Sequence, residues 1–183
     1  MARAKQAKSG GQDTPDAISL LKADHRQVED WFGQFEKARD ADKKQRLATQ
    51  ICNALKVHTT IEEEIFYPAF LEATDEKDIH HEAEVEHDGA KKLIAEIEGS
   101  SPDDDYFDAK VKVLSEMIKH HVKEEEKPGG MFSEARDSEM DLDELGAQLA
   151  ARKAELEEAP DEDVEEPPPG GGRSRSSERR QHG

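Results

Sequence analysis

Cysteine, aromatic residues and long apolar runs are all scarce in this chain of 183 residues. The single cysteine, Cys52, excludes an intrachain disulfide and a cysteine-based zinc site. No apolar run approaches the ~18 residues of a membrane-spanning helix. The basic, polar stretch from Met1 to Gln12 lacks the apolar region of a secretory signal. We therefore expect a cytoplasmic protein with no membrane partner and with one domain or at most two.

Positive charge is scarce as well, because 26 Lys and Arg residues face 44 Asp and Glu residues and give a net charge of −18. Nucleic-acid binding needs a basic surface that replaces the counterions of the phosphates, so we expect no nucleic-acid partner. Only 33% of the residues are hydrophobic, and low hydrophobicity with high net charge is typical of disordered chains. The arrangement of the few apolar residues therefore decides whether a core exists.

Both ends of the sequence have the composition of unfolded tails. Residues 1–15 are basic and contain a Gly-Gly pair, whereas residues 160–183 combine an acidic run, consecutive prolines, consecutive glycines and an Arg-rich end. Such tracts do not bury enough apolar surface to offset the entropy lost on ordering. We predict disordered tails over 1–15 and 160–183, so the folded part must hold the excess negative charge.

Residues 16–128 contain four segments in which apolar residues recur at helical spacing. The predicted breaks between and after these segments are at Ala41, at Thr74, at Gly99–Pro102 and at Pro128. Short connections make consecutive helices antiparallel neighbours, so we predict an all-α fold, an up-and-down four-helix bundle over 16–128. Residues 129–159 are predicted to add a C-terminal helix, from about Asp141 to Glu158, that packs on the bundle.

Two local features refine the expected helix boundaries. Ser101 is a suitable N-cap for the fourth helix, with Pro102 at its first position. Pro68 falls within the apolar stripe of the second helix, where its missing N–H and its ring disfavour regular helix. We therefore expect a kink or a helix end near Pro68.

Each of the four apolar stripes is interrupted by a histidine, and two of them by a glutamate as well. His58 and Glu62 are four residues apart, as are His121 and Glu125, so on a helix each pair shares one face. Counted from the connecting turns, the histidines lie at similar heights in the bundle, since one residue of helix rises only ~1.5 Å. The predicted metal ligands are His25, His58, Glu62, His87, His121 and Glu125.

A lone histidine on an apolar face is usually a hydrogen-bonded core residue, but four in register favour a metal site. A buried carboxylate without a partner costs several kcal/mol, and a metal ion removes that cost. Imidazole and carboxylate ligands without thiolate suit iron, manganese or zinc. Six protein ligands exceed what one tetrahedral zinc ion takes, so the set suits two ions.

In these stretches the sequence resembles hemerythrin-like proteins of the HHE cation-binding family. The resemblance rests on Leu21–Val28, His58–Pro68, Glu86-His87 and His121–Glu126. It implies a four-helix bundle around a non-haem centre of two iron ions joined by an oxo or hydroxo bridge. The ligands that it implies are the six residues named above.

One position departs from the oxygen-carrying proteins of this type, which resemble the pattern but have a second histidine one turn before the histidine of the third helix. Here that position is Ala83, and Glu84 is a candidate to complete the site. The neighbouring His80 and His81, like His120, are expected on helix surfaces. Fewer protein ligands on one iron disfavour stable, reversible O₂ carriage and leave room for NO or peroxide binding, redox reaction or iron sensing.

The sequence therefore predicts a protein that binds O₂, NO or peroxide at a di-iron centre, in sensing, storage or detoxification. Two alternatives stay open. One is an iron- or oxygen-responsive regulatory module, in which metal binding is coupled to folding, and the other is a metal-free helical interaction domain. No second cofactor motif and no organic substrate pocket can be recognised, so the sequence favours a binding protein over an enzyme and assigns no catalytic residue.

Overall fold

The computed structural model describes residues 14–158, and within them every regular element is helical. The elements are α1 (Ala17–Lys37), α2 (Ala41–Ile61), the π-helical turn η1 (Glu62–Phe66), α3 (Tyr67–Thr74), α4 (Lys77–Glu98), α5 (Phe107–Glu126), α6 (Met131–Asp137) and α7 (Leu142–Glu158). The tails predicted as disordered lie outside the described residues, except for Thr14 and Pro15. None of the described helices is long and apolar enough to cross a membrane.

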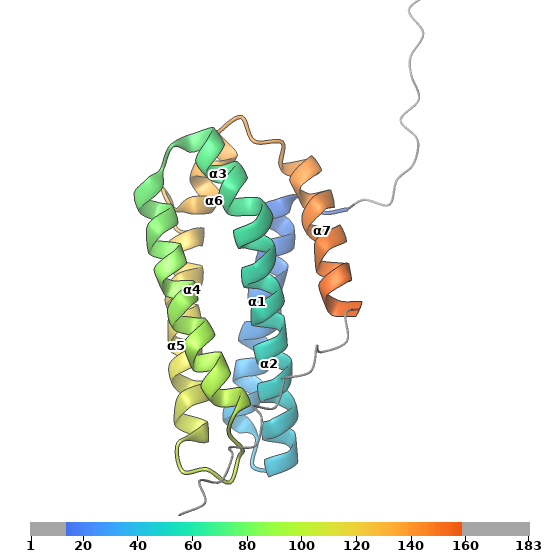
Figure 1. The fold of residues 1–183 in the computed structure, drawn as a ribbon, viewed down its shortest axis with the longest axis vertical. Helices are drawn as coiled ribbons and strands as arrows, with labels where there is room; N and C mark the ends of the chain where they lie inside the picture. The colour runs from blue at the N-terminus through green and yellow to red at the C-terminus, as the bar shows by residue number, and fades with distance from the viewer. Residues whose placement is uncertain (1–13, 159–183) are drawn as a thin grey trace, which may run out of the picture.

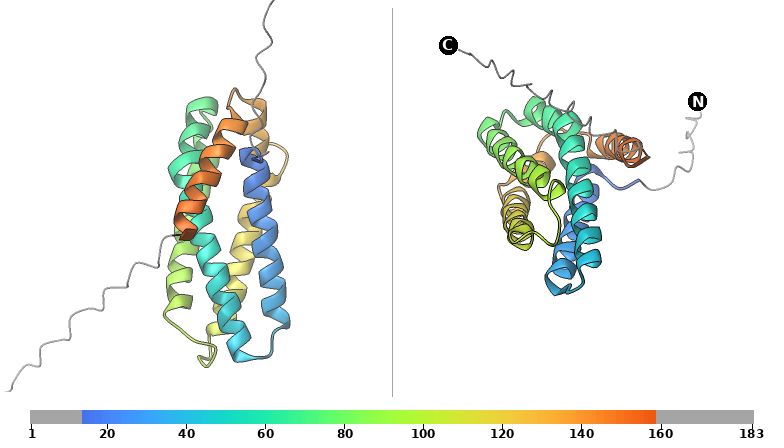
Figure 2. Two further views of the ribbon diagram at one scale, coloured as in Figure 1. Left: turned by 90° about the vertical axis from the view of Figure 1, so that its right-hand side faces the viewer. Right: turned by 60° about the horizontal axis from the view of Figure 1, so that its bottom comes forward.

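The four long helices α1, α2, α4 and α5 run up and down side by side, as predicted (Figure 1). Contacts join α1 to α2, α2 to α4, α4 to α5 and α5 back to α1, so the four helices form a closed square. The right-hand view in Figure 2, in which the bottom of the bundle is turned toward the reader, shows the four helices side by side. Helix α7 lies outside the square against α1 and α2, which confirms the additional C-terminal helix.

Short polar side chains begin three of the helices by accepting hydrogen bonds from otherwise unpaired backbone N–H groups. Asp16 accepts from the Ser19 N–H at 3.0 Å to start α1. Asp40 accepts from the Lys43 N–H at 2.8 Å to start α2. Asp141 accepts from the Glu144 N–H at 3.0 Å at the start of α7, close to the helix start predicted from the sequence.

The predicted irregularity near Pro68 takes the form of a π-helical turn. The backbone N–H of Tyr67 bonds to the carbonyl of Glu62, five residues earlier. Because a π turn returns residue i+5 to the face of residue i, Glu62 and Tyr67 both point into the bundle, where their exposed fractions are 0% and 1%. A regular α-helix would have rotated the Tyr67 side chain away from that face.

One boundary prediction was wrong, and one short helix was not predicted. Helix α5 begins at Phe107, so Ser101 is not its N-cap, and Ser101–Tyr106 forms turns in which the Asp104 carboxylate accepts from the Ser101 N–H at 2.7 Å. The segment after Pro128 holds two helices where one was predicted, because α6 precedes α7. Helix α6 buries Met131, Phe132 and Ala135 over the end of the bundle.

The apolar core consists of two clusters of buried side chains. The first lies toward the α1–α2 and α4–α5 turns and is built around Phe32, Ile51, Ile94, Phe107 and Leu114. The second lies toward α3, α6 and α7 and is rich in aromatic rings, among them Phe66, Phe70 and Phe132. Within residues 14–158, the buried polar residues are His25, His58, Thr59, Glu62, His80, His87, Ser115, His121 and Glu125.

Candidate metal centre

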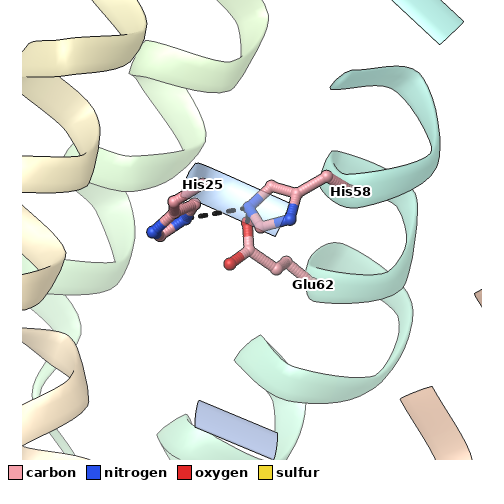
Figure 3. A group of neighbouring side chains, drawn as sticks. All are labelled: His25, His58 and Glu62. Carbon is pink, nitrogen blue, oxygen red and sulfur yellow. Dashed lines mark hydrogen bonds and ion pairs between the residues drawn. The ribbon is translucent and has the colours of Figure 1, made fainter. Parts of the chain in front are cut away.

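Four buried histidines meet inside the bundle, one from each long helix. His25 on α1 and His58 on α2 form the first pair, with their Nε2 atoms 3.1 Å apart; Figure 3 shows this contact. His87 on α4 and His121 on α5 form the second pair, with their Nε2 atoms 3.2 Å apart. We call these the α1–α2 pair and the α4–α5 pair. All four rings are at most 5% exposed.

Two buried carboxylates lie between the pairs, and each touches one histidine of each pair. Glu62 Oε2 is 3.3 Å from His58 Nε2 and 3.3 Å from His87 Nε2. The second carboxylate belongs to Glu125, which contacts His25 Nε2 through Oε2 at 3.3 Å and His121 Nε2 through Oε1 at 3.5 Å. The structure thus brings together all six side chains that the sequence singled out.

The donor atoms fit two metal ions. His25, His58 and Glu62 form one group of ligand atoms within 4.8 Å of one another, and Glu62, His87 and His121 form a second. An imidazole nitrogen lies ~2.1 Å from a zinc-sized ion, so two such ligands at a right angle lie ~3 Å apart, as the Nε2 atoms of each pair do. Since Glu62 belongs to both groups, it is suited to bridge two ions.

Two carboxylate oxygens at this centre lack hydrogen-bond partners within residues 14–158. These atoms, Oε1 of Glu62 and Oε2 of Glu125, are buried, and the two residues are 0% and 3% exposed. A buried carboxylate oxygen without a partner is costly, and a cation removes the cost. Glu125 Oε2 still faces His25 Nε2 at 3.3 Å, so Glu62 Oε1 is the atom of this centre that a metal ion explains best and the described hydrogen bonds do not.

Without metal, protons supply positive charge at the centre. Burial alone would lower the pKa of His58, but the charge of Glu62 and the contact with Asp24 outweigh it and raise the pKa to about 10. Burial would likewise lower the pKa of His121, but the charge of Glu125 and the contact with Glu86 outweigh it and raise the pKa to about 9. Despite burial, the charge of His58 holds the pKa of Glu62 well below its ordinary value. A metal ion must displace the protons on both histidines.

The outward-facing Nδ1 atom of each histidine meets a carboxylate from a neighbouring helix. His25 Nδ1 is 2.9 Å from Glu126, and His87 Nδ1 is 2.9 Å from Glu63. His121 Nδ1 is 2.7 Å from the carboxylate of Glu86. Such a contact fixes the imidazole so that Nε2 presents its lone pair inward, and it strengthens the ring as a ligand. The fourth contact, between His58 Nδ1 and Asp24, is longer at 3.6 Å.

These outer carboxylates link the four long helices in a closed circuit. Each outer carboxylate is adjacent in the sequence to one of the six proposed ligands, which we call the inner six. Each one contacts the histidine of the next helix around the square. The circuit runs from Asp24 on α1 to His58 on α2, from Glu63 on η1 to His87 on α4, from Glu86 on α4 to His121 on α5, and from Glu126 on α5 to His25 on α1. Rotation of one helix would therefore disturb two histidines.

The hydroxyl of Tyr67 lies at the centre, where no residue pattern predicted it. It is 3.1 Å from His87 Nε2, 3.4 Å from Glu125 Oε1 and 3.5 Å from Glu62 Oε2. Burial and the two carboxylates raise its pKa well above the ordinary value, so the hydroxyl keeps its proton. The signal that could have found it is Pro68, which favours an irregular turn just before it.

Residues near Ala83 settle two further predictions. Ala83 is 4% exposed and stands where the oxygen-carrying proteins that the sequence resembles have a second histidine on the third helix. Glu84 does not reach the centre, since its side chain is 54% exposed and its nearest partner is His80 at 3.6 Å. The surface position predicted for His80 was wrong: it is 9% exposed and packs edge-on against Tyr67. His81 and His120 are exposed, as predicted.

A small cavity of about 20 Å³ adjoins all four histidines. Its remaining walls are mostly apolar and come from Val28, Leu55, Ile118 and Val122, together with Asp24 and Thr59. A cavity must offer ~10–15 Å³ to hold one water molecule. This space is therefore large enough for a ligand of only a few atoms.

Known proteins share both the sequence pattern and the fold. The hemerythrin HHE cation-binding domain matches residues 16–128. A DNA nickase from a Nostoc species is 30% identical over 107 residues, which are 58% of this chain and only 30% of that protein. The chain therefore spans less than a third of that curated relative.

A solved structure, that of a hemerythrin HHE cation-binding domain-containing protein from Mycobacterium kansasii, superimposes with a TM-score of 0.65 at 20% identity. The likeness covers 78% of this chain and 87% of the other, and it extends over the bundle fold. That likeness concerns the fold, and the family match over residues 16–128 covers more than half of the chain. The chain belongs to the hemerythrin HHE cation-binding family.

Proposed function

We propose that the protein holds two iron ions in a non-haem centre and binds O₂, NO or peroxide there. The observation that carries the proposal is the pair of donor groups that share Glu62, each with two inward-facing Nε2 atoms. The proposed ligands are His25, His58, Glu62, His87, His121 and Glu125. Iron at such a site supplies Lewis-acid and redox chemistry.

The surrounding residues support a small, neutral ligand. The cavity of about 20 Å³ lies beside all four histidines, and its other walls are mostly aliphatic side chains, which favour a small neutral ligand over larger molecules. The Tyr67 hydroxyl, within 3.1 Å of His87, can donate a hydrogen bond at the α4–α5 pair. The protein's own task is thus to hold the ions, to limit the size of the ligand and to keep a proton donor in place.

Metal content and spectra test the proposal. Anaerobic loading of the apo-protein with Fe²⁺ should leave two iron atoms per chain after desalting, as measured by elemental analysis. Addition of O₂ or NO should then change the near-ultraviolet and visible spectrum. The variant His58→Ala should lose bound iron, whereas the exposed control His81→Ala should keep two. A colourless protein that retains zinc in preference to iron would overturn the assignment.

A regulatory role is a second candidate, favoured by one contact of α7. Lys153 on α7 forms an ion pair with Asp24, which in turn faces His58 across 3.6 Å. Occupancy of the centre would thereby affect how firmly α7 is held on α1 and α2. Equal melting temperatures and equal protease sensitivity of the α7 segment with and without iron would exclude this role.

A further inference from the structure

A third group of metal-ligating side chains lies at the surface, between α4 and α5. It comprises Glu82 and Glu86 on α4 and His120 on α5, whose ligand atoms lie within 4.8 Å of one another. His120 Nε2 is 3.3 Å from Glu86 Oε1. Glu124, one helical turn after His120, adds a third carboxylate on the same side. Exposed acidic groups are common on proteins that bind no ion, so the structure around this group must show whether it can act as a metal site.

A narrow cleft of about 70 Å³ connects this group to the buried centre. Its outer wall includes Glu82, Glu86 and Glu124, and its inner wall includes His121 and Glu125. The remaining walls are formed by Ile79, Ala83, Lys127, Gly129, Gly130 and Met131. The small side chain of Ala83 contributes to the space, which a histidine at this position would reduce.

The inner end of the cleft carries a buried carboxylate oxygen that makes no hydrogen bond with the described residues, although His25 Nε2 lies 3.3 Å from it. Glu125 is 3% exposed, lines the cleft, and its Oε2 accepts no hydrogen bond from the described residues. The two ends are also joined through one side chain, because Glu86 contacts surface His120 through Oε1 and buried His121 through Oε2 at 2.7 Å. Carboxylate oxygens thus line the cleft from solvent to the centre.

We propose that Glu82, Glu86 and His120 form a transient docking site for a divalent first-row metal ion, from which the ion passes along the cleft to His121 and Glu125. The inference rests on the proposed metal centre, because it describes how that centre is loaded. Two carboxylates and one imidazole suit such an ion. Exposure makes the site weak, as a transfer site requires. A cleft lined by one sign of charge also raises the local concentration of the opposite ion.

The positive charge of Lys127 should oppose the entry of a metal ion. The proposal therefore also predicts a change that speeds metal uptake. It lines the cleft and forms an ion pair with Glu124. An incoming divalent ion must compete with this ammonium group for the carboxylate. Removal of the lysine should therefore speed loading, whereas removal of the acidic groups should slow it.

The rate of metal uptake by the full-length apo-protein tests the proposal, with Co²⁺ as the probe because its visible absorption reports the acquisition of protein ligands. The double variant Glu82→Gln/Glu124→Gln changes no proposed ligand of the buried centre. Its uptake should be about tenfold slower than that of the unchanged protein, while the final content stays at two ions per chain. The variant Lys127→Gln should take up Co²⁺ faster, and added salt should reduce the difference among the three proteins.

A matched control removes the same charge elsewhere on the same helices. Glu84 on α4 and Glu116 on α5 are exposed and do not line the cleft, so Glu84→Gln/Glu116→Gln should load at nearly the unchanged rate. Equal slowing in both double variants would overturn the docking site and leave only a general charge effect. Equal rates in all variants would overturn it as well. If the unchanged protein does not retain two ions, the proposed centre itself is wrong, which is a separate outcome.

Discussion

The two histidine pairs are nearly alike in geometry but differ in what surrounds them. In the α1–α2 pair, the Phe132 ring stacks on His25 with centroids 5.7 Å apart, and Lys22 and Arg26 hold the outer carboxylate Glu126. In the α4–α5 pair, the ring of Tyr67 stacks on His87 with centroids 5.4 Å apart and brings a hydroxyl to the centre.

The outer side of the α4–α5 pair differs too. There Glu86 pairs with the exposed His120, at the mouth of the acidic cleft. On the other side, fixed cations and an apolar ring close off the α1–α2 pair. The comparison shows that ligand pairs of similar geometry can differ in the groups behind them, which tune the histidines as ligands: fixed cations and an aromatic ring at one pair, an acidic cleft at the other.

Removal of the shared carboxylate should have the largest effect. Glu62 contacts a histidine of each pair and belongs to both donor groups, so Glu62→Ala should abolish retention of both ions. Elemental analysis after loading and desalting measures this, with far-ultraviolet circular dichroism to verify that the helices remain. Retention of one ion per chain would show instead that the two pairs bind metal independently.

The pH dependence of metal binding should be nearly as large. In the apo-protein the pKa of His58 is raised to about 10 and that of His121 to about 9, so each pair carries a proton at pH 7. Binding of the two ions must release both protons. The overall binding constant for both ions should therefore rise about a hundredfold per pH unit above pH 7, or about tenfold for each ion, and the rise should level off near pH 9. Calorimetry in buffers of different ionisation enthalpy counts the protons released.

The same pKa shifts give the stability of the apo-protein the opposite trend. Because both folded-state values lie above the ordinary 6.5, the stabilisation is complete below pH 6.5 and is lost as pH rises through 9 and 10. The depressed pKa of Glu62 contributes stability above its ordinary 4.5 that is lost on acidification. Urea unfolding at several pH values should find apo-stability from these groups greatest between about 4.5 and 6.5. Apo-stability that increases from pH 7 to 10 would contradict these protonation states.

Replacement of the outer carboxylates should distinguish the pairs more finely. Glu126→Gln and Glu86→Gln each remove the charge behind one histidine, and each should weaken metal binding by about 10–100-fold. We expect Glu126→Gln to weaken metal binding at the α1–α2 pair. We expect Glu86→Gln to weaken metal binding at the α4–α5 pair. Competition with a chelator resolves the two steps, and Glu116→Gln is the exposed control. Equal weakening of both ions by either variant would show that the pairs act as one unit.

The bundle was predictable because helical periodicity and histidine spacing both follow from 3.6 residues per turn. That period also placed the six inner side chains at one height. It did not find Tyr67, whose spacing of five residues from Glu62 brings the two together only within a π turn. Nor did it find His80 in the interior, since the Tyr67 ring that covers it comes from another helix.

The outer carboxylates escaped prediction for a related reason. Glu63, Glu86 and Glu126 each stand beside one of the inner six in the sequence, so their own helices turn them away from the centre. Their partners lie on the next helix, and that contact depends on how neighbouring helices are rotated against each other. In a sequence with 44 acidic residues, nothing distinguishes these from carboxylates that face only solvent.

The smallest effect should come from Tyr67→Phe. This variant also tests the difference between the two pairs most directly, because the Tyr67 hydroxyl contacts His87 of the α4–α5 pair. The change removes only the hydroxyl, whose contacts of 3.1 to 3.5 Å are long, so apo-stability should fall by about 1–2 kcal/mol in urea unfolding. Two ions should still be retained, because the hydroxyl is outside both donor groups. The spectrum with NO should change, since a proton donor beside the α4–α5 pair is gone. Loss of an ion would instead show that Tyr67 is a metal ligand. The two pairs would then differ in the ligands that contact the ions directly.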